Sequence, residues 1–311
     1  MPIVLISGGS GLIGTHLSGH LVEKGYEVII LTREKNKVSA NPKISFSYWN
    51  VDKKIIDADI VTKTDHIIHL AGAGVMDKKW TQHYKNIILE SRTKSAEFLI
   101  SCLKENDHHV KTFVSASAIG WYGADRKTLI RKEGFIETDA PANDFLGETC
   151  KLWEASVELV AAPGTRLVKL RTGIVLSNDG GAFKEYKMPL RFGIAALLGN
   201  GKQIVSWIHI EDLCRMYSEA IENNSLEGSY NAVAPGPVSQ KTLMLTLGQK
   251  LKNRFFIPIY VPSLLLKLIF GKRSIEILKS TTVSDQKIKE AGFTFLYPSI
   301  EAAIDELIGH D

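Results

Sequence analysis

The chain is poor in the features that mark secreted, membrane-spanning and nucleic-acid-binding proteins. Its 311 residues hold only three cysteines, too widely spaced for a disulfide framework or a metal-binding set. The longest apolar stretch, at about 261–270, is broken by Pro262 and Lys267 and is too short to span a bilayer. The net charge is only +4 and the basic residues are scattered, which argues against nucleic acid. We therefore expect a cytoplasmic protein with a small-molecule ligand, and neither a nucleic-acid nor a membrane partner.

A glycine-rich turn separates an apolar strand from an amphipathic helix at the start of the chain. Residues 3–6 are apolar and rich in β-branched side chains, so we expect a core strand there and no signal peptide. The glycines that follow let the backbone approach a ligand, and the next helix presents free N–H groups to a pyrophosphate. This spacing predicts a dinucleotide site that consists of Gly8, Ser10, Gly11, Leu12, Ile13 and Gly14.

Strand-like and helix-like segments then alternate up to Gly173, which is typical of a Rossmann-type, doubly wound parallel sheet in an α/β protein. After Gly173 the chain has glycine-rich loops and shorter strands. We expect a dinucleotide-binding domain over 1–173, with a return to it at about 203–224. The remainder of 174–311 should form a smaller, mixed substrate lobe that ends in a helical module at about 255–311. The further predicted strands are 27–32, 44–48, 66–70, 112–117 and 166–170.

Basic residues follow the second predicted strand, whose tip faces the adenosine ribose in a Rossmann unit. Arg33 comes first, with Lys35 and Lys37 close behind it. Arginine pairs well with a 2′-phosphate, so we favour NADP(H) over NAD, with a solvated basic loop as the alternative. The other residues that we expect to contact the cofactor lie at or near strand ends: Thr32, Leu70, Ala71, Gly72, Ser115 and Arg171.

The stretch 115–123 lies at the carboxyl end of the fifth predicted strand, where open α/β sheets bind ligands. Together with the glycine turn, it resembles the extended short-chain dehydrogenase/reductase superfamily of sugar-nucleotide epimerases and dehydratases. The resemblance implies that Ser117 polarises a substrate oxygen. It also implies a tyrosine acid/base, and a lysine four residues later that binds the nicotinamide ribose. Lys151 fits the lysine, but Gly147 stands where the tyrosine should be, and glycine cannot transfer a proton.

The whole chain is similar to a narrower, epimerase-like group whose members are often labelled cell-division inhibitors. That resemblance implies an extended Rossmann fold with NADP binding, and little about the substrate. No residue supports an activity in cell division. The sequence segments that carry the resemblance are 8–14, 69–73, 115–123, 145–154, 171–176, 180–182, 206–209 and 230–235. A C-terminal module of the DUF1731 type follows, with the segments 261–262 and 292–298.

Two function classes stay open without the tyrosine. One is an NADP(H)-dependent epimerase, dehydratase or reductase acting on a small carbonyl or sugar-nucleotide-like substrate. The other is a catalytically silent NADP-binding regulator or sensor. For an enzyme, Tyr122 is our first candidate as the replacement acid/base, against the alternative that it only packs a loop. Lys151 either donates a proton or holds the ribose, and we prefer the second.

We expect Gly147 to leave a gap beside the nicotinamide, on the helix face that it shares with Lys151. His209 is either a structural residue at a helix entry or an acid/base in the cleft. The oligomeric state is open, with a homodimer as one option. The residues that we expect to contact substrate are Ala73, Trp121, Phe183, Gln203, Ser206, Trp207 and His209.

Overall fold

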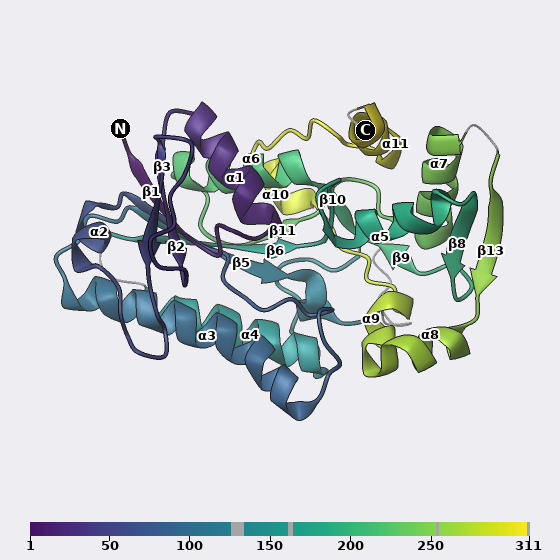
Figure 1. Ribbon diagram of the computed structural model, residues 1–311, viewed down its shortest axis with the longest axis horizontal. Helices are drawn as coiled ribbons and strands as arrows, with labels where there is room; N and C mark the ends of the chain where they lie inside the picture. The colour runs from purple at the N-terminus through teal and green to yellow at the C-terminus, as the bar shows by residue number, and fades with distance from the viewer. Residues whose placement is uncertain (126–133, 161–163, 253–254, 310–311) are drawn as a thin grey trace.

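A parallel sheet of seven strands forms the centre of the larger lobe (Figure 1). The structure is a computed structural model that describes residues 1–125, 134–160, 164–252 and 255–309. The strand order is β11-β6-β5-β4-β1-β2-β3, and every neighbouring pair is parallel. The strands are β1 (Ile3–Ser7), β2 (Glu27–Thr32), β3 (Ile44–Tyr48), β4 (His66–His69), β5 (Thr112–Ala118), β6 (Arg166–Thr172) and β11 (Gly228–Ala232).

Helices cover both faces of this sheet (Figure 1). Val4 and Ile6 face the core under α1 and α6, whereas Leu5 between them faces the core under α3 and α4. This alternation follows from the two-residue period of a strand, and it explains why the strands of a doubly covered sheet are apolar throughout. The predicted doubly wound α/β fold is confirmed. The helices are α1 (Leu12–Glu23), α2 (Ala58–Lys63), α3 (Gln82–Glu105), α4 (Phe145–Glu158) and α6 (Ile210–Glu222).

The sheet order reverses at the boundary between β1 and β4. From β1 the chain moves outward through β2 to β3, and then crosses back to β4 on the other side of β1. Loops at the carboxyl ends of two such strands diverge, and this divergence creates a ligand site in open α/β sheets. The glycine turn after β1 and the loop after β4 meet at this point.

In the described part of the smaller lobe there are three two-stranded sheets, β10-β7, β12-β9 and β13-β8. Its own core includes Phe183, Trp207, Leu243 and Ile304. The elements are β7 (Ile174–Leu176), α5 (Gly181–Leu190), β8 (Ile194–Leu198), β9 (Ile204–Val205), β10 (Trp207–His209), β12 (Val238–Ser239), α7 (Gln240–Lys252), β13 (Ile257–Val261), α8 (Ser263–Phe270), α9 (Ser274–Leu278) and α11 (Ile300–Gly309), with the 3₁₀ turn η2 (Gly271–Arg273). The 3₁₀ turn η1 (Ile119–Tyr122) follows β5, and α10 (Gln286–Glu290) packs against β11 of the central sheet.

The chain returns to the larger lobe after β10. Helix α6 packs against α1, and β11 then joins the edge of the central sheet beside β6. Elements of the larger lobe therefore extend past the predicted return at about 203–224, because β11 ends at Ala232 and Ile288 of α10 belongs to the core under α1 and α6. Across the described residues, no helix has the length and apolar character needed to cross a membrane.

Candidate functional site

The glycines of the first turn differ in whether the fold leaves space for a side chain. Gly8 has φ +74°, and a Cβ on it would lie 2.7 Å from the Leu70 carbonyl carbon after β4. A Cβ on Gly14 would lie 2.5 Å from the Gly9 Cα, so α1 sits directly on the turn. Gly11 has an ordinary φ of −80°, is exposed, and would meet only the Gly8 oxygen, at 3.4 Å. The protein itself therefore does not require a glycine at position 11.

The N-terminus of α1 is uncapped. Gly11 is the N-cap residue, it offers no side-chain hydrogen bond, and the first turn of the helix holds no acidic residue. The first N–H groups of a helix have no partner inside the helix. Together with the turn, they form an open cradle of N–H donors at the positive end of the helix dipole. This arrangement suits a pyrophosphate group.

A cavity of about 530 Å³ opens at the carboxyl ends of β2 and β3. Thr32 and Lys37 line it, whereas Arg33 is exposed outside its lining. The Lys37 ammonium lies 3.4 Å from a Glu34 carboxylate oxygen, and the Lys35 ammonium lies 5.3 Å from the centre of the Tyr48 ring. Of the three predicted basic residues, Lys37 lines this cavity, and Lys35 lies over the ring of Tyr48, which also lines it.

Ser117 and Arg171 come together in a buried network under α4. The Ser117 hydroxyl donates to Glu154 Oε1 at 2.7 Å. Arg171 donates through Nε and Nη2 to the two oxygens of the same carboxylate, at 2.7 and 2.9 Å. Ser115 is also buried, and its hydroxyl donates to the Ala116 carbonyl. In this structure these side chains hydrogen-bond to protein groups of the core.

Tyr122 is fully buried, and its hydroxyl belongs to the same network. It donates to Asn231 Oδ1 at 2.6 Å and accepts from Arg171 Nη1 at 3.0 Å, and burial raises its pKa. The half-buried Trp121 donates to the Asp139 carbonyl and lies under the Arg171 guanidinium. The network ties η1 to β6 and β11, so the geometry favours the packing interpretation of Tyr122.

We expect Tyr122→Phe to lower stability and to leave dinucleotide affinity unchanged. The buried Asn231 oxygen would lose its donor, which costs about 1–3 kcal/mol. Urea unfolding and NADPH titration of the same preparation check both expectations, with Tyr260→Phe on the exposed β13 as the matched control. If NADPH turnover were found and fell sharply in a Tyr122→Phe protein of normal stability, Tyr122 would be catalytic.

The face of α4 that meets the end of β5 does not carry Lys151. The Lys151 side chain is exposed, and its ammonium lies 3.6 Å from a Glu148 oxygen. A Cβ on Gly120 would instead lie 3.3 Å from Leu146 Cβ and 3.6 Å from Cys150 Sγ. Burial raises the pKa of the Cys150 thiol to about 12, so it stays protonated at neutral pH. The face of α4 that meets η1 therefore carries Leu146 and Cys150, one position before the predicted face of Gly147 and Lys151.

The expected gap at Gly147 is wrong. Gly147 is buried, and a Cβ there would overlap the Ala142 carbonyl oxygen. The backbone that leads into α4 occupies the space, so only glycine fits without movement of this backbone. Gly147 therefore leaves no room for a substrate group.

Most of the remaining predicted substrate residues are buried or hydrogen-bonded within the protein. Phe183 and Trp207 are fully buried in the smaller lobe. The Gln203 amide donates to the Leu198 carbonyl, and the Ser206 hydroxyl donates to the Thr281 carbonyl at 2.8 Å. Ala73 alone lies at the end of β4, where its amide donates to Ser91 Oγ. The structure therefore does not bring these residues to one surface.

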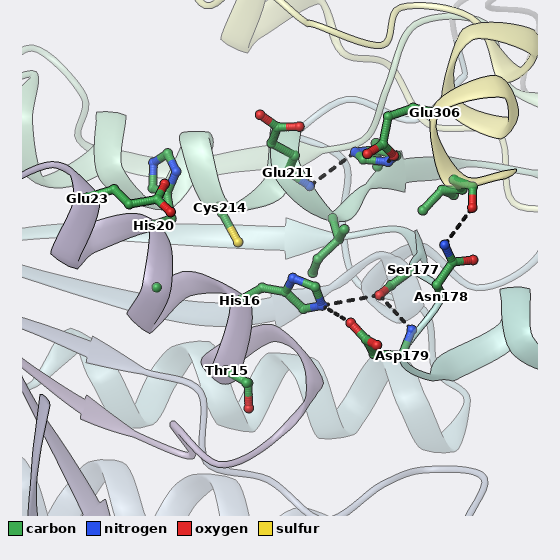
Figure 2. Close-up of a pocket in the computed structure, with 14 residues that line it drawn as sticks. Thr15, His16, His20, Glu23, Ser177, Asn178, Asp179, Glu211, Cys214 and Glu306 are labelled. Carbon is green, nitrogen blue, oxygen red and sulfur yellow. Dashed lines mark hydrogen bonds and ion pairs between the residues drawn. The ribbon is translucent and has the colours of Figure 1, made fainter. Parts of the chain in front are cut away.

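His209 lines a second cavity, of about 520 Å³, along the side of α1 (Figure 2). Its Nε2 lies 2.7 Å from Glu306 Oε2 on α11, and its Nδ1 accepts from the Glu211 amide at the start of α6. Across the cavity, His16 Nε2 lies 2.8 Å from an Asp179 oxygen. Burial lowers the pKa of His209. These contacts favour the structural, helix-entry interpretation. In the described parts of the chain, no group of His, Cys, Asp and Glu could hold a metal ion.

Arg92 on α3 was not among the residues predicted from the sequence. It is partly buried, and its Nη1 donates to the Ala73 carbonyl after β4. One signal was present: Arg92 falls in register with Ile88, Ser95 and Leu99, which form the buried stripe of the helix. An arginine on such a stripe is unusual, because a charge is costly to bury.

The chain belongs to the NAD dependent epimerase/dehydratase family, whose model matches residues 4–233. A domain of unknown function (DUF1731) matches residues 261–307. An epimerase family protein of Staphylococcus saprophyticus is 35% identical over 311 residues, which is 99% of this chain and 100% of that protein. A Staphylococcus aureus epimerase family protein is 34% identical over 308 residues, 99% of each chain.

Two solved structures extend the comparison. The crystal structure of the human epimerase family protein SDR39U1 with NADPH superposes with a TM-score of 0.86 at 27% identity, and covers 99% of this chain and 100% of that one. A nucleoside-diphosphate sugar epimerase from Corynebacterium glutamicum gives 0.76 at 30% identity, over 100% of this chain and 59% of that one. The predicted resemblance to extended short-chain dehydrogenases/reductases with a DUF1731-type module is confirmed.

Proposed function

We propose that the protein binds NADP(H) across the carboxyl edge of its sheet and acts on a small carbonyl or sugar-nucleotide-like substrate in the cytoplasm. The observation that carries this proposal is the open cradle at Gly11, where the fold itself does not require glycine but a pyrophosphate does. NADP(H) bound there would supply hydride chemistry. The human relative named with NADPH supports the phosphorylated form of the cofactor.

We assign residues to each part of the cofactor. The N–H groups from Leu12 to Gly14, in the first turn of α1, would hold the pyrophosphate, since the Gly11 N–H already donates to the Gly8 carbonyl. Thr32 and the basic residues around the cavity at β2 would hold the adenosine end, and Arg33 is free to turn toward a 2′-phosphate because its side chain is exposed. The backbone at 70–73 would support the nicotinamide end.

Arg33→Ala should reduce the preference for NADPH over NADH by about tenfold or more, because one charge-assisted phosphate contact contributes roughly 1.5–3 kcal/mol. Fluorescence titration with both nucleotides measures the preference. Lys43→Ala is the matched control, since Lys43 is an exposed cation near the opposite end of the same strands. Equal affinities of the unchanged protein for NADPH and NADH would refute the assignment to NADP(H).

A catalytically silent NADP-binding protein is the second candidate. It is favoured by Gly147 at the position of the expected tyrosine, by Leu146 and Cys150 on the α4 face that meets η1, and by the exposed position of Lys151. A screen of carbonyl compounds and sugar nucleotides for NADPH oxidation or epimerisation separates the two. Any turnover supports the enzyme, whereas nucleotide binding without turnover over the whole screen supports the silent protein.

A further inference from the structure

The Arg92 side chain extends from α3 into the space between the end of β4 and α4. Its guanidinium carbon lies 5.0 Å from the centre of the Trp153 ring on α4. On the β4 side, a Cβ on Gly72 would lie 2.9 Å from the same carbon. Gly72 is two residues after Leu70, against which Gly8 packs. The guanidinium therefore lies next to the loop that meets the glycine turn.

The hydrogen bonds of Arg92 all use one nitrogen. Nη1 donates to the Ala73 carbonyl at 3.0 Å and to the Ile88 carbonyl at 2.7 Å. In the described part of the chain, Nε and Nη2 have no partner, yet neither is sealed from solvent. Nor does any described carboxylate form an ion pair with Arg92. A partly buried charge without a counter-ion is costly, so this arrangement is incomplete as it stands.

Arg171 shows the completed arrangement in the same protein. Its Nη1 donates to the Glu137 carbonyl and the Tyr122 hydroxyl, while its Nε and Nη2 grip the Glu154 carboxylate at 2.7 and 2.9 Å. In Arg92, Nη1 is likewise fixed by oxygen acceptors, here two carbonyl groups, but Nε and Nη2 have no carboxylate partner among the described residues. The planar fork of Nε and Nη2 matches a carboxylate in geometry and charge.

We propose that Arg92 binds the carboxylate of an acidic substrate through its Nε–Nη2 edge, beside the nicotinamide end of the cofactor site. The inference rests on the proposed function, because it is the bound dinucleotide that makes this a substrate site. The Ala73 and Ile88 carbonyls hold the guanidinium in place, so little side-chain entropy is lost on binding. An uncharged analogue leaves the guanidinium without a counter-ion, which makes the site selective for acids.

Matched pairs of ligands that differ by one carboxylate test this inference. Pyruvate is compared with pyruvamide, and UDP-glucuronate with UDP-glucose, by calorimetric titration of the protein with and without saturating NADPH. At least one acid should bind about 10- to 100-fold more tightly than its neutral partner, as a charge-assisted bidentate contact provides. Arg92→Met should abolish this difference, and Arg92→Lys should keep a part of it.

Lys94→Met is the control, because Lys94 lies on the same helix but is exposed and pairs with Glu90. It should bind acids as the unchanged protein does. Circular dichroism and thermal unfolding of every variant establish folding. If Arg92→Met fails to fold, Arg92→Lys takes its place in the comparison of acid and neutral ligands. Equal binding of acid and neutral partner throughout would overturn the inference. So would an Arg92→Met protein that loses NADPH affinity while it still discriminates acids.

The test separates this inference from the proposed function. If NADPH does not bind the unchanged protein, the proposed function fails, whatever Arg92 does. If NADPH binds tightly and no acid is preferred, the dinucleotide site stands and the carboxylate site is wrong.

Discussion

Gly11→Val is expected to abolish binding of NADPH and NADH while the protein stays folded. A Cβ at this position meets only the Gly8 oxygen, at 3.4 Å, and φ is −80°, so the backbone accepts a side chain without strain. The same side chain would stand over the uncapped N-terminus of α1, where a pyrophosphate must approach the backbone. We expect affinity to fall at least about 100-fold, which corresponds to roughly 2.7 kcal/mol.

Gly19→Ala is the matched control, since Gly19 lies later in the same helix with no atom within 4 Å of its added Cβ. It should leave nucleotide affinity unchanged and stabilise the fold by about 0.5–1 kcal/mol, as alanine does in helix interiors. Isothermal titration and urea unfolding measure both quantities. Tight nucleotide binding by a folded Gly11→Val protein would place the dinucleotide elsewhere.

The strands, the glycine turn and the alternation of strands and helices in the larger lobe could be predicted because their signals are local. An apolar run such as residues 3–6 of β1, followed by glycines and a helical pattern, leaves few alternatives. The smaller lobe was predicted only as a mixed lobe. Its two-stranded sheets join segments far apart in the chain, and these segments are too short to have a clear period.

The site was harder to predict, for two physical reasons. Each residue turns a helix by about 100°, so an error of one position separates the exposed Lys151 from the buried Cys150. Contacts between residues on neighbouring strands also cannot be predicted from a local sequence pattern. Tyr122 follows strand β5 and Asn231 lies on β11, and only the pairing of β5, β6 and β11 brings them within 2.6 Å.

Glu154→Ala should cause a large loss of stability. Glu154 and Arg171 expose only 6% and 3% of their side chains, and they form two hydrogen bonds with each other. Removal of the carboxylate leaves the Arg171 charge buried and unpaired, and breaking such a pair costs about 3–5 kcal/mol. The Ser117 hydroxyl loses its acceptor as well. The free energy of unfolding, measured in urea, should fall by this amount.

Two further variants test whether the loss of stability in Glu154→Ala comes from the unpaired charge of Arg171. Glu148→Ala, on the same helix, removes a carboxylate that is 46% exposed, and should cost at most about 1 kcal/mol. The double variant Glu154→Leu/Arg171→Met removes both charges, and should recover a large part of the loss, because apolar pairs of similar volume replace buried ion pairs at little cost. If Glu154→Ala alone were as stable as Glu148→Ala, the network would not hold η1, β6 and α4 together. If the double variant were less stable than Glu154→Ala, the hydrogen bonds to Ser117 and Tyr122 would outweigh the burial of charge.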